Sequence, residues 1–201
     1  MFVHYTRVFF LNKISDLYMY GLVNKAAQDF IIQDHGMQTW LTIKKKAGVE
    51  EDAFISMEPY PDEITYNIVG AASEILKVDS GDILENFGRY WIEFTMEDGY
   101  AHLLDLAGKT FSDFLRNLNN MHAHIAQNLS QLRPPSFLCV DIDESTFLLE
   151  YHSDRAGLRR FVEGLLLGLG DRFNLEVEVQ HLGSIPGSEN SHEFKIQWSQ
   201  S

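Results

Sequence analysis

The chain has 201 residues, of which 16 are basic and 29 acidic, giving a formal net charge of −13. This length suits one domain whose core is large enough to enclose a flat ligand. The negative field repels nucleic acid and anionic membrane surfaces, so we expect protein or small-molecule partners, with no nucleic acid and no membrane. The single cysteine, Cys139, excludes an intrachain disulfide and a multi-cysteine metal site, which favours a reducing, cytoplasmic location.

The sequence gives no sign of a membrane-spanning or secretory segment. No apolar run approaches the roughly 20 residues needed to span a bilayer. Residues 1–18 also lack the apolar stretch and the small-residue cleavage site of a signal peptide. We therefore interpret residues 1–18 as an amino-terminal tail and residues 19–201 as a single domain, with Met19 as a plausible alternative start.

Helical periodicity runs from Met19 to about Tyr100. A first apolar stripe stops at Gly36, and Ser80 is the expected cap of a later helix. The prolines at positions 59 and 61 predict a loop between the first two stripes. The three stripes consist of Leu22, Val23, Ala26, Ala27, Phe30 and Ile31; of Ile64, Ile68, Ala71, Ala72, Ile75 and Leu76; and of Ile83, Leu84, Phe87, Trp91 and Phe94.

The second half of the chain combines helical and β-like patterns. The pattern predicts a helix of about six turns over 110–133, capped by Thr110 and stopped by Pro134 and Pro135. A second helix is predicted over 156–173. Helices followed by strands indicate an α+β fold, with a helical amino-terminal subdomain and a mainly antiparallel sheet. The predicted strands cover 137–140, 147–155, 175–182 and 193–198.

One histidine lies on the apolar face of the helix after Thr110. His122 follows Leu118 by four residues and precedes Ile125 by three, whereas His124 falls among polar residues on the opposite face. The two histidines are about 200° apart around the helix, so they cannot chelate one metal together. Taken alone, a histidine on an apolar face is more often a core residue than a metal ligand.

The segment 147–155 carries a group of polar side chains at alternate positions. On a strand this spacing projects Tyr151, Ser153 and Arg155 from the same side. Two hydroxyls and a guanidinium fork are suited to binding carboxylates. The alternative is the solvated face of an edge strand, which we would favour without the rest of the sequence.

Four motifs in order resemble the H-NOX family, the haem–nitric oxide/oxygen-binding domains that include the sensor domain of soluble guanylate cyclase. Tyr151-His-Ser-Asp-Arg155 is similar to the family's Y-x-S-x-R signature. The other three are Met19-Tyr-Gly-Leu-Val-Asn-Lys-Ala26, similar to the family's amino terminus, Leu118-Asn-Asn-Met-His122, similar to its proximal-ligand segment, and Arg133-Pro-Pro-Ser-Phe137, similar to its proline turn. The resemblance extends from about Met19 to the end of the chain.

The resemblance implies haem b as cofactor, with His122 as the proximal iron ligand. A neutral imidazole on an apolar face suits that role. Tyr151, Ser153 and Arg155 would bind the propionates, and Pro135 would press on the porphyrin, although a helix-stopping role for Pro135 is equally consistent with the sequence. Leu118 and Met121 complete the expected cofactor-binding residues.

The resemblance also places five residues at the open iron site: Val23, Trp91, Thr95, Phe161 and Leu165. Family members that hold oxygen stably use a distal tyrosine as hydrogen-bond donor, but the matching residue here is Phe161, which donates nothing. We therefore expect nitric oxide and carbon monoxide to bind and oxygen to be excluded. The indole N–H of Trp91 is the one donor that would weaken this expectation.

The implied function is a gas sensor and not an enzyme. In the family, nitric oxide weakens or breaks the bond from the proximal histidine, here His122, and the resulting motion signals to a partner such as a histidine kinase or a cyclic-nucleotide enzyme. Two alternatives stay open: a haem enzyme, which would need a distal acid–base group, and a haem-free interaction module.

The pair Asp141 and Asp143 also resembles the D-x-D motif of haloacid-dehalogenase-like phosphatases, but the alternating strand–helix context is missing.

Overall fold

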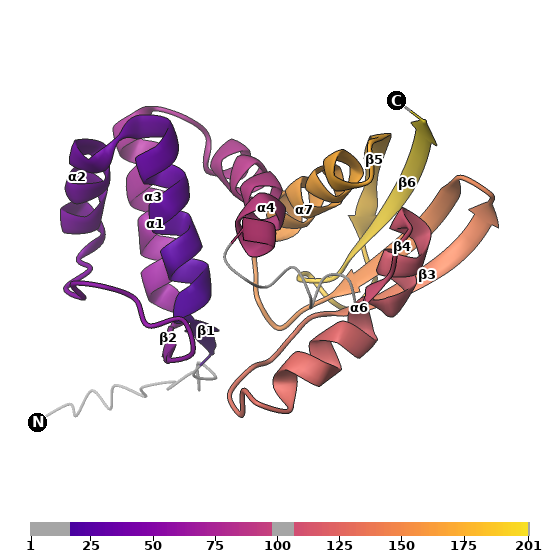
Figure 1. The fold of residues 1–201 in the computed structure, drawn as a ribbon, viewed down its shortest axis with the longest axis horizontal. Helices are drawn as coiled ribbons and strands as arrows, with labels where there is room; N and C mark the ends of the chain where they lie inside the picture. Colours follow the sequence, from indigo (N-terminus) through magenta and orange to yellow (C-terminus); the bar gives the residue numbers. More distant parts are fainter. Residues whose placement is uncertain (1–16, 98–106, 201) are drawn as a thin grey trace, which may run out of the picture.

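The computed structural model describes residues 17–97 and 107–200. Its amino-terminal half is helical, and its carboxy-terminal half combines a sheet with helices (Figure 1). The predicted α+β class is therefore confirmed. The described elements are β1 (Tyr18–Tyr20), α1 (Gly21–His35), α2 (Met37–Ala47), β2 (Pro59–Pro61), α3 (Asp62–Leu76), α4 (Ser80–Glu97), α6 (Phe111–Ala126), β3 (Ser136–Asp143), β4 (Thr146–His152), α7 (Arg159–Arg172), β5 (Leu175–Ser184) and β6 (His192–Gln200).

The four longer strands form one antiparallel sheet in the order β3-β4-β6-β5. Alternate residues of these strands enter the core beneath α6 and α7, including Phe147 and Leu149 of β4 and Phe194 and Ile196 of β6. The remaining residues point to the opposite face. Because Asp141 and Asp143 lie on an antiparallel edge strand, the strand–helix alternation of a D-x-D phosphatase is absent from the described residues.

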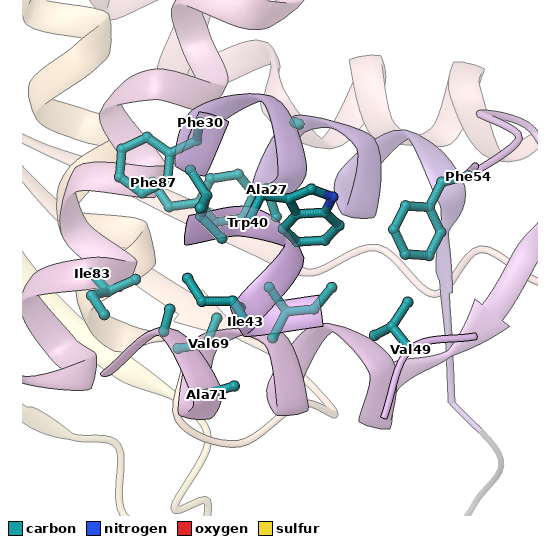
Figure 2. Packing of buried hydrophobic residues seen from close by; sticks show 14 of the residues in the cluster. Ala27, Phe30, Trp40, Ile43, Val49, Phe54, Val69, Ala71, Ile83 and Phe87 are labelled. Carbon is teal, nitrogen blue, oxygen red and sulfur yellow. The ribbon is translucent and has the colours of Figure 1, made fainter. Parts of the chain in front are cut away.

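Two hydrophobic cores meet at α4. The first lies among α1, α2, α3 and α4, and Figure 2 shows Phe30, Trp40 and Phe87 packed within it. The second lies between the sheet and helices α6 and α7. Trp91 of α4 packs against both cores, so it joins the helical half to the sheet half.

Glycines allow α4 and α7 to approach closely. A Cβ atom on Gly164 of α7 would overlap the carbonyl oxygen of Glu85, and one on Gly88 of α4 would lie 2.8 Å from the backbone nitrogen of Leu165. These two helices lie side by side in Figure 1, between the helical half and the sheet. The glycines therefore fix how the two halves of the molecule meet.

Three predicted boundaries are wrong. The helix predicted over 110–133 ends at Ala126, because the polar residues that follow form turns with short-range backbone bonds such as Leu132 N–H to Leu129 O. The strand predicted over 147–155 ends at His152, and the next helix begins at Arg159 and not at position 156.

Helix α2 was not predicted, because no apolar stripe indicated it. It buries little besides Trp40 and Ile43.

The division into a tail over 1–18 and a domain over 19–201 stays a prediction. Strand β1 begins at Tyr18, one residue before the expected domain start, and pairs with β2. Residues 1–16 of the expected tail lie outside the described residues. Among the described helices, none has the length and apolar character needed to cross a membrane.

Candidate functional site

Helix α6 positions His122. The Thr110 hydroxyl caps the helix by accepting the backbone N–H of Asp113 at 3.1 Å, as predicted from the sequence. Phe111, Phe114, Leu115 and Leu118 bury one side of the helix in the second core, and Met121 packs at its margin. His122 lies one turn beyond Leu118 on this side, whereas His124 is exposed.

His122 lies in an apolar environment and lacks a polar partner on one nitrogen. Its ring stacks on Phe137 of β3, with 5.8 Å between ring centroids and 20° between planes. Its Nδ1 atom is buried and has no hydrogen-bond partner among the described residues. Burial lowers the pKa of His122 to about 4, so the imidazole is neutral at pH 7. A neutral imidazole with a free nitrogen is the form that ligates a metal.

Phe137 connects His122 to Tyr151. The rings of Phe137 and Tyr151 are 5.6 Å apart, and the two residues are cross-strand partners in the pairing of β3 with β4. The Asn119 side chain holds Phe137 in place, because its amide accepts the Phe137 N–H at 2.9 Å and donates to the Phe137 carbonyl at 2.6 Å. Helix α6 and the edge of β3 are thus fixed against each other beside His122.

Tyr151 and Ser153 lie together at the end of β4. Tyr151 is buried, and this burial raises the pKa of its phenol, partly opposed by the Ser153 hydroxyl beside it. Ser153 lies after the strand, where its hydroxyl accepts the Arg155 backbone N–H at 3.0 Å. The turn formed by this bond, and not strand alternation, therefore sets the direction of Arg155.

Arg155 lies beyond the end of β4, so the predicted strand alternation does not place it, although its positive charge and the Ser153 hydroxyl both act on the Tyr151 phenol. Arg155 is 6% exposed, and its guanidinium binds Asp62 at the start of α3, with Nε to Oδ2 at 2.8 Å and a longer 3.4 Å contact from the second nitrogen. It also donates to the carbonyls of Arg133 at 2.7 Å and Tyr18 at 2.8 Å. Arg155 thus joins β1, α3 and the loop after α6 to the sheet half.

This guanidinium site accepts a carboxylate. Of the five N–H groups of an arginine, the four contacts with Asp62, Arg133 and Tyr18 use four, which leaves one N–H on Nη1. The Tyr20 hydroxyl adds a further link to the same loop by accepting the Gln131 N–H at 3.3 Å. The half-buried Pro135 follows in this loop and leads directly into β3.

The structure groups most of the predicted distal residues around α4 and α7. The Phe161 ring lies 5.2 Å from Phe87, whose ring is 6.5 Å from that of Trp91. Phe161 packs against the first core and Leu165 against the second. Val23, on α1, also packs against the first core. Thr95 is buried, and its hydroxyl donates to backbone carbonyls of its own helix, Trp91 O at 2.8 Å and Ile92 O at 3.0 Å.

Sequence reasoning missed two features. Asp62, the partner of Arg155, lies 93 residues away and directly after Pro61, where an aspartate is expected simply to begin a helix. His181 and His192 have no ligand-type spacing, yet adjacent strands bring His181 Nε2 within 3.3 Å of His192 Nδ1.

Within the described ranges, no group of three or more histidine, cysteine, aspartate or glutamate side chains could hold a metal ion.

Comparison of the sequence with known families gives one match over most of the chain. Residues 20–181 match the family described as Haem-NO-binding. Among curated proteins, the soluble guanylate cyclases gcy-33 and gcy-32 of Caenorhabditis elegans are each 30% identical over 165 residues, covering 82% and 80% of this chain. The chain spans only 18% and 24% of these relatives' own lengths.

Solved structures give the same fold. An H-NOX protein from S. oneidensis in the Fe(II) state has a TM-score of 0.82 at 17% identity, with 91% of this chain and 97% of that chain covered. An unliganded Fe(II) H-NOX protein from K. algicida has a TM-score of 0.77 at 19% identity, with 91% and 98% covered. Because the family match covers residues 20–181, the chain belongs to the Haem-NO-binding, or H-NOX, family of haem-based gas-sensing domains.

Proposed function

We propose that this domain senses nitric oxide, and also binds carbon monoxide, through haem b held by His122. The observation that carries the proposal is the His122 side chain itself: a neutral imidazole, stacked on Phe137, with a buried Nδ1 that has no partner among the described residues. A core histidine of purely structural function normally satisfies both ring nitrogens. When bound, the haem supplies the iron to which a diatomic gas attaches.

The residues around His122 fit a flat apolar group. Phe137 stacks on the imidazole, and Leu118 and Met121, on the same helix as His122, lie in and against the second core. Pro135 precedes the strand that carries Phe137. Low polarity keeps water from competing for the metal and keeps the imidazole unprotonated. We assign Leu118, Met121 and Pro135 to this proximal surface.

The propionate-binding role divides unequally among the three residues of the signature. Tyr151 and Ser153 offer hydroxyl donors whose positions are set by burial and by the turn at Arg155. Arg155 already binds Asp62, which indicates that its pocket suits a carboxylate and leaves one N–H for a second acceptor. We propose that Tyr151 and Ser153 are the principal donors and that Arg155 supplies positive charge and one further bond.

The distal residues support selectivity against oxygen. Val23, Phe161 and Leu165 carry no hydrogen-bond donor, and the Thr95 hydroxyl is occupied by carbonyls of its own helix. Bound oxygen depends more than nitric oxide or carbon monoxide on such a donor. The indole of Trp91 packs between the two cores as a largely apolar group. None of these residues is an acid–base group, which disfavours a haem peroxidase.

The signal would leave the site through α6. His122 is rigidly attached to this helix, and Asn119 couples the helix to β3. A displacement of His122 therefore shifts α6 against the sheet and changes the surface offered to a partner. We propose a separate signalling protein, such as a histidine kinase or a cyclic-nucleotide enzyme, as the receiver, with no catalytic step in this domain.

A matched pair of glycine substitutions tests the assignment of the ligand. His122→Gly should replace the imidazole-ligated spectrum of the reduced, haem-loaded protein and alter its response to nitric oxide, and free imidazole should restore the spectrum by filling the vacated space. His124→Gly introduces the same helix defect on the exposed face and should leave both properties intact. A His122→Gly variant with an unaltered spectrum and gas response would contradict the proposal.

A further inference from the structure

The outer face of the sheet is divided into an apolar part and a polar part. On the edge strand β3, Leu138, Val140 and Ile142 are 52%, 44% and 54% exposed, and Leu148 of β4 is the cross-strand partner of Val140. Strands β5 and β6 instead present mainly glutamate, glutamine and lysine on this face: Glu176, Glu178, Gln180, Glu193, Lys195 and Gln197. An exposed apolar edge strand is uncommon in a monomer and marks a contact surface.

The apolar stripe of β3 ends in negative charge. Asp143 and Glu144 directly follow Ile142 at the turn into β4, and both are exposed. The side chain of Asp143 accepts hydrogen bonds from within its own turn and makes no ion pair among the described residues. This surface, defined by Leu138, Val140, Ile142, Asp143 and Glu144, is called the β3 face below.

Helix α2 presents the complementary pattern. Met37 and Leu41 are 51% and 47% exposed, and Lys45 follows at the same spacing of four residues, so the three share one side of the helix. Lys44 lies at the flank of this side. The opposite side of the helix is buried through Trp40 and Ile43. This surface, defined by Met37, Leu41, Lys44 and Lys45, is called the α2 face below.

We propose that the β3 face of one molecule binds the α2 face of a second copy of this chain. Both faces consist of a short apolar row that ends in charge, negative on β3 and positive on α2. Met37 to Lys45 spans about 12 Å along a helix, and Leu138 to Glu144 spans about 20 Å along an extended chain, so the α2 face would cover part of the length of the β3 face. Apolar contact would supply attraction, and the charges would set the direction of the contact.

The geometry excludes closure of this contact within one molecule. Figure 1 places α2 at one end of the molecule and the β3–β4 pair at the other. Two different surfaces are therefore used, which makes the association head-to-tail, and each added copy presents a fresh face to the next. Because each face is small, we expect weak binding, with a dissociation constant between about 1 µM and about 1 mM.

Sedimentation velocity of the haem-loaded full chain tests the proposal. The average mass of the wild type should rise with concentration up to about 1 mM and pass beyond the dimer. Met37→Gln/Leu41→Gln removes the apolar row of the α2 face, and Leu138→Thr/Val140→Thr/Ile142→Thr removes that of the β3 face. Each variant alone should remain monomeric, but an equimolar mixture should form dimers and nothing larger, because each variant retains the face that the other lacks.

A control variant distinguishes this contact from nonspecific association through exposed apolar side chains. Val78→Thr/Leu182→Thr removes two exposed apolar side chains outside both faces, 38% and 45% exposed, and should associate like the wild type. Lys45→Glu should weaken association at least tenfold. A wild type that stays monomeric throughout overturns the proposal. Self-association of either face variant alone, which would indicate a symmetric dimer, also overturns it. So does a mixture that remains monomeric while both variants are folded.

Discussion

The buried ion pair between Arg155 and Asp62 predicts a large and non-additive loss of stability when it is broken. Both side chains are nearly inaccessible, 6% and 7% exposed. Asp62→Asn preserves the shape of the side chain but leaves the Arg155 charge buried without its counter-ion. Breaking a buried pair in this way costs about 3–5 kcal/mol. This is a large part of the 5–15 kcal/mol by which a typical domain is stable.

The double variant distinguishes pairing from simple packing. Arg155→Met leaves the Asp62 carboxylate unpaired and also strips donors from the carbonyls of Tyr18 and Arg133. Adding Asp62→Asn to this variant removes the unpaired charge, so the double variant should be no less stable than Arg155→Met alone. Additive losses, with the double variant less stable by the full cost of Asp62→Asn, would refute the reasoning.

Urea unfolding of the haem-free protein at pH 7, followed by circular dichroism, measures these differences. The matched control is Asp171→Asn, which breaks the exposed pair of Arg89 and Asp171, whose side chains are 45% and 65% accessible. That substitution should cost no more than about 1 kcal/mol. An Asp62→Asn variant that loses no more stability than this control would show that the buried pair contributes little.

Three further outcomes are expected. Gly164→Ala should destabilise the protein by about 1–3 kcal/mol in urea unfolding because its methyl group would overlap the carbonyl of Glu85. Gly70→Ala, in an open helical position, should instead stabilise it by about 0.5–1 kcal/mol. Burial lowers the pKa of His122 to about 4 in the haem-free fold, whereas the unfolded chain titrates near 6.5 and binds the proton first. Stability should therefore fall as the pH drops from 6.5 to 4, by up to about 3 kcal/mol more in the wild type than in His122→Gln; equal pH profiles would contradict this. Phe161→Tyr should give a reduced protein whose absorption spectrum responds reversibly to air, and Phe161→Leu should not.

The sequence predicted best where a local pattern carries the information. The capped helix after Thr110 follows from 3.6-residue periodicity, as does the inward position of His122 on it. The antiparallel sheet follows from short alternating segments separated by turns. Family resemblance added the expected ligand and gas pocket, which periodicity alone leaves open.

The errors arose where tertiary contacts decide the outcome. Arg155 ends the alternating pattern of 147–155 but lies three residues beyond the end of β4, where the Ser153 turn directs it towards Asp62. That pairing joins distant parts of the chain. Helix α2 buries so little that it leaves no clear apolar stripe, yet it forms a full helix against α1 and α3. Local sequence carries no record of such long-range partners.

The absorption spectrum of the purified, reduced, haem-reconstituted protein tests the central claim most directly. We predict a spectrum typical of ferrous haem with one axial imidazole, which changes when nitric oxide is added and stays unchanged in air apart from slow oxidation. A spectrum that changes rapidly and reversibly in air would contradict the predicted exclusion of oxygen. Absence of any haem band after reconstitution would contradict the sensor itself and favour a haem-free interaction module.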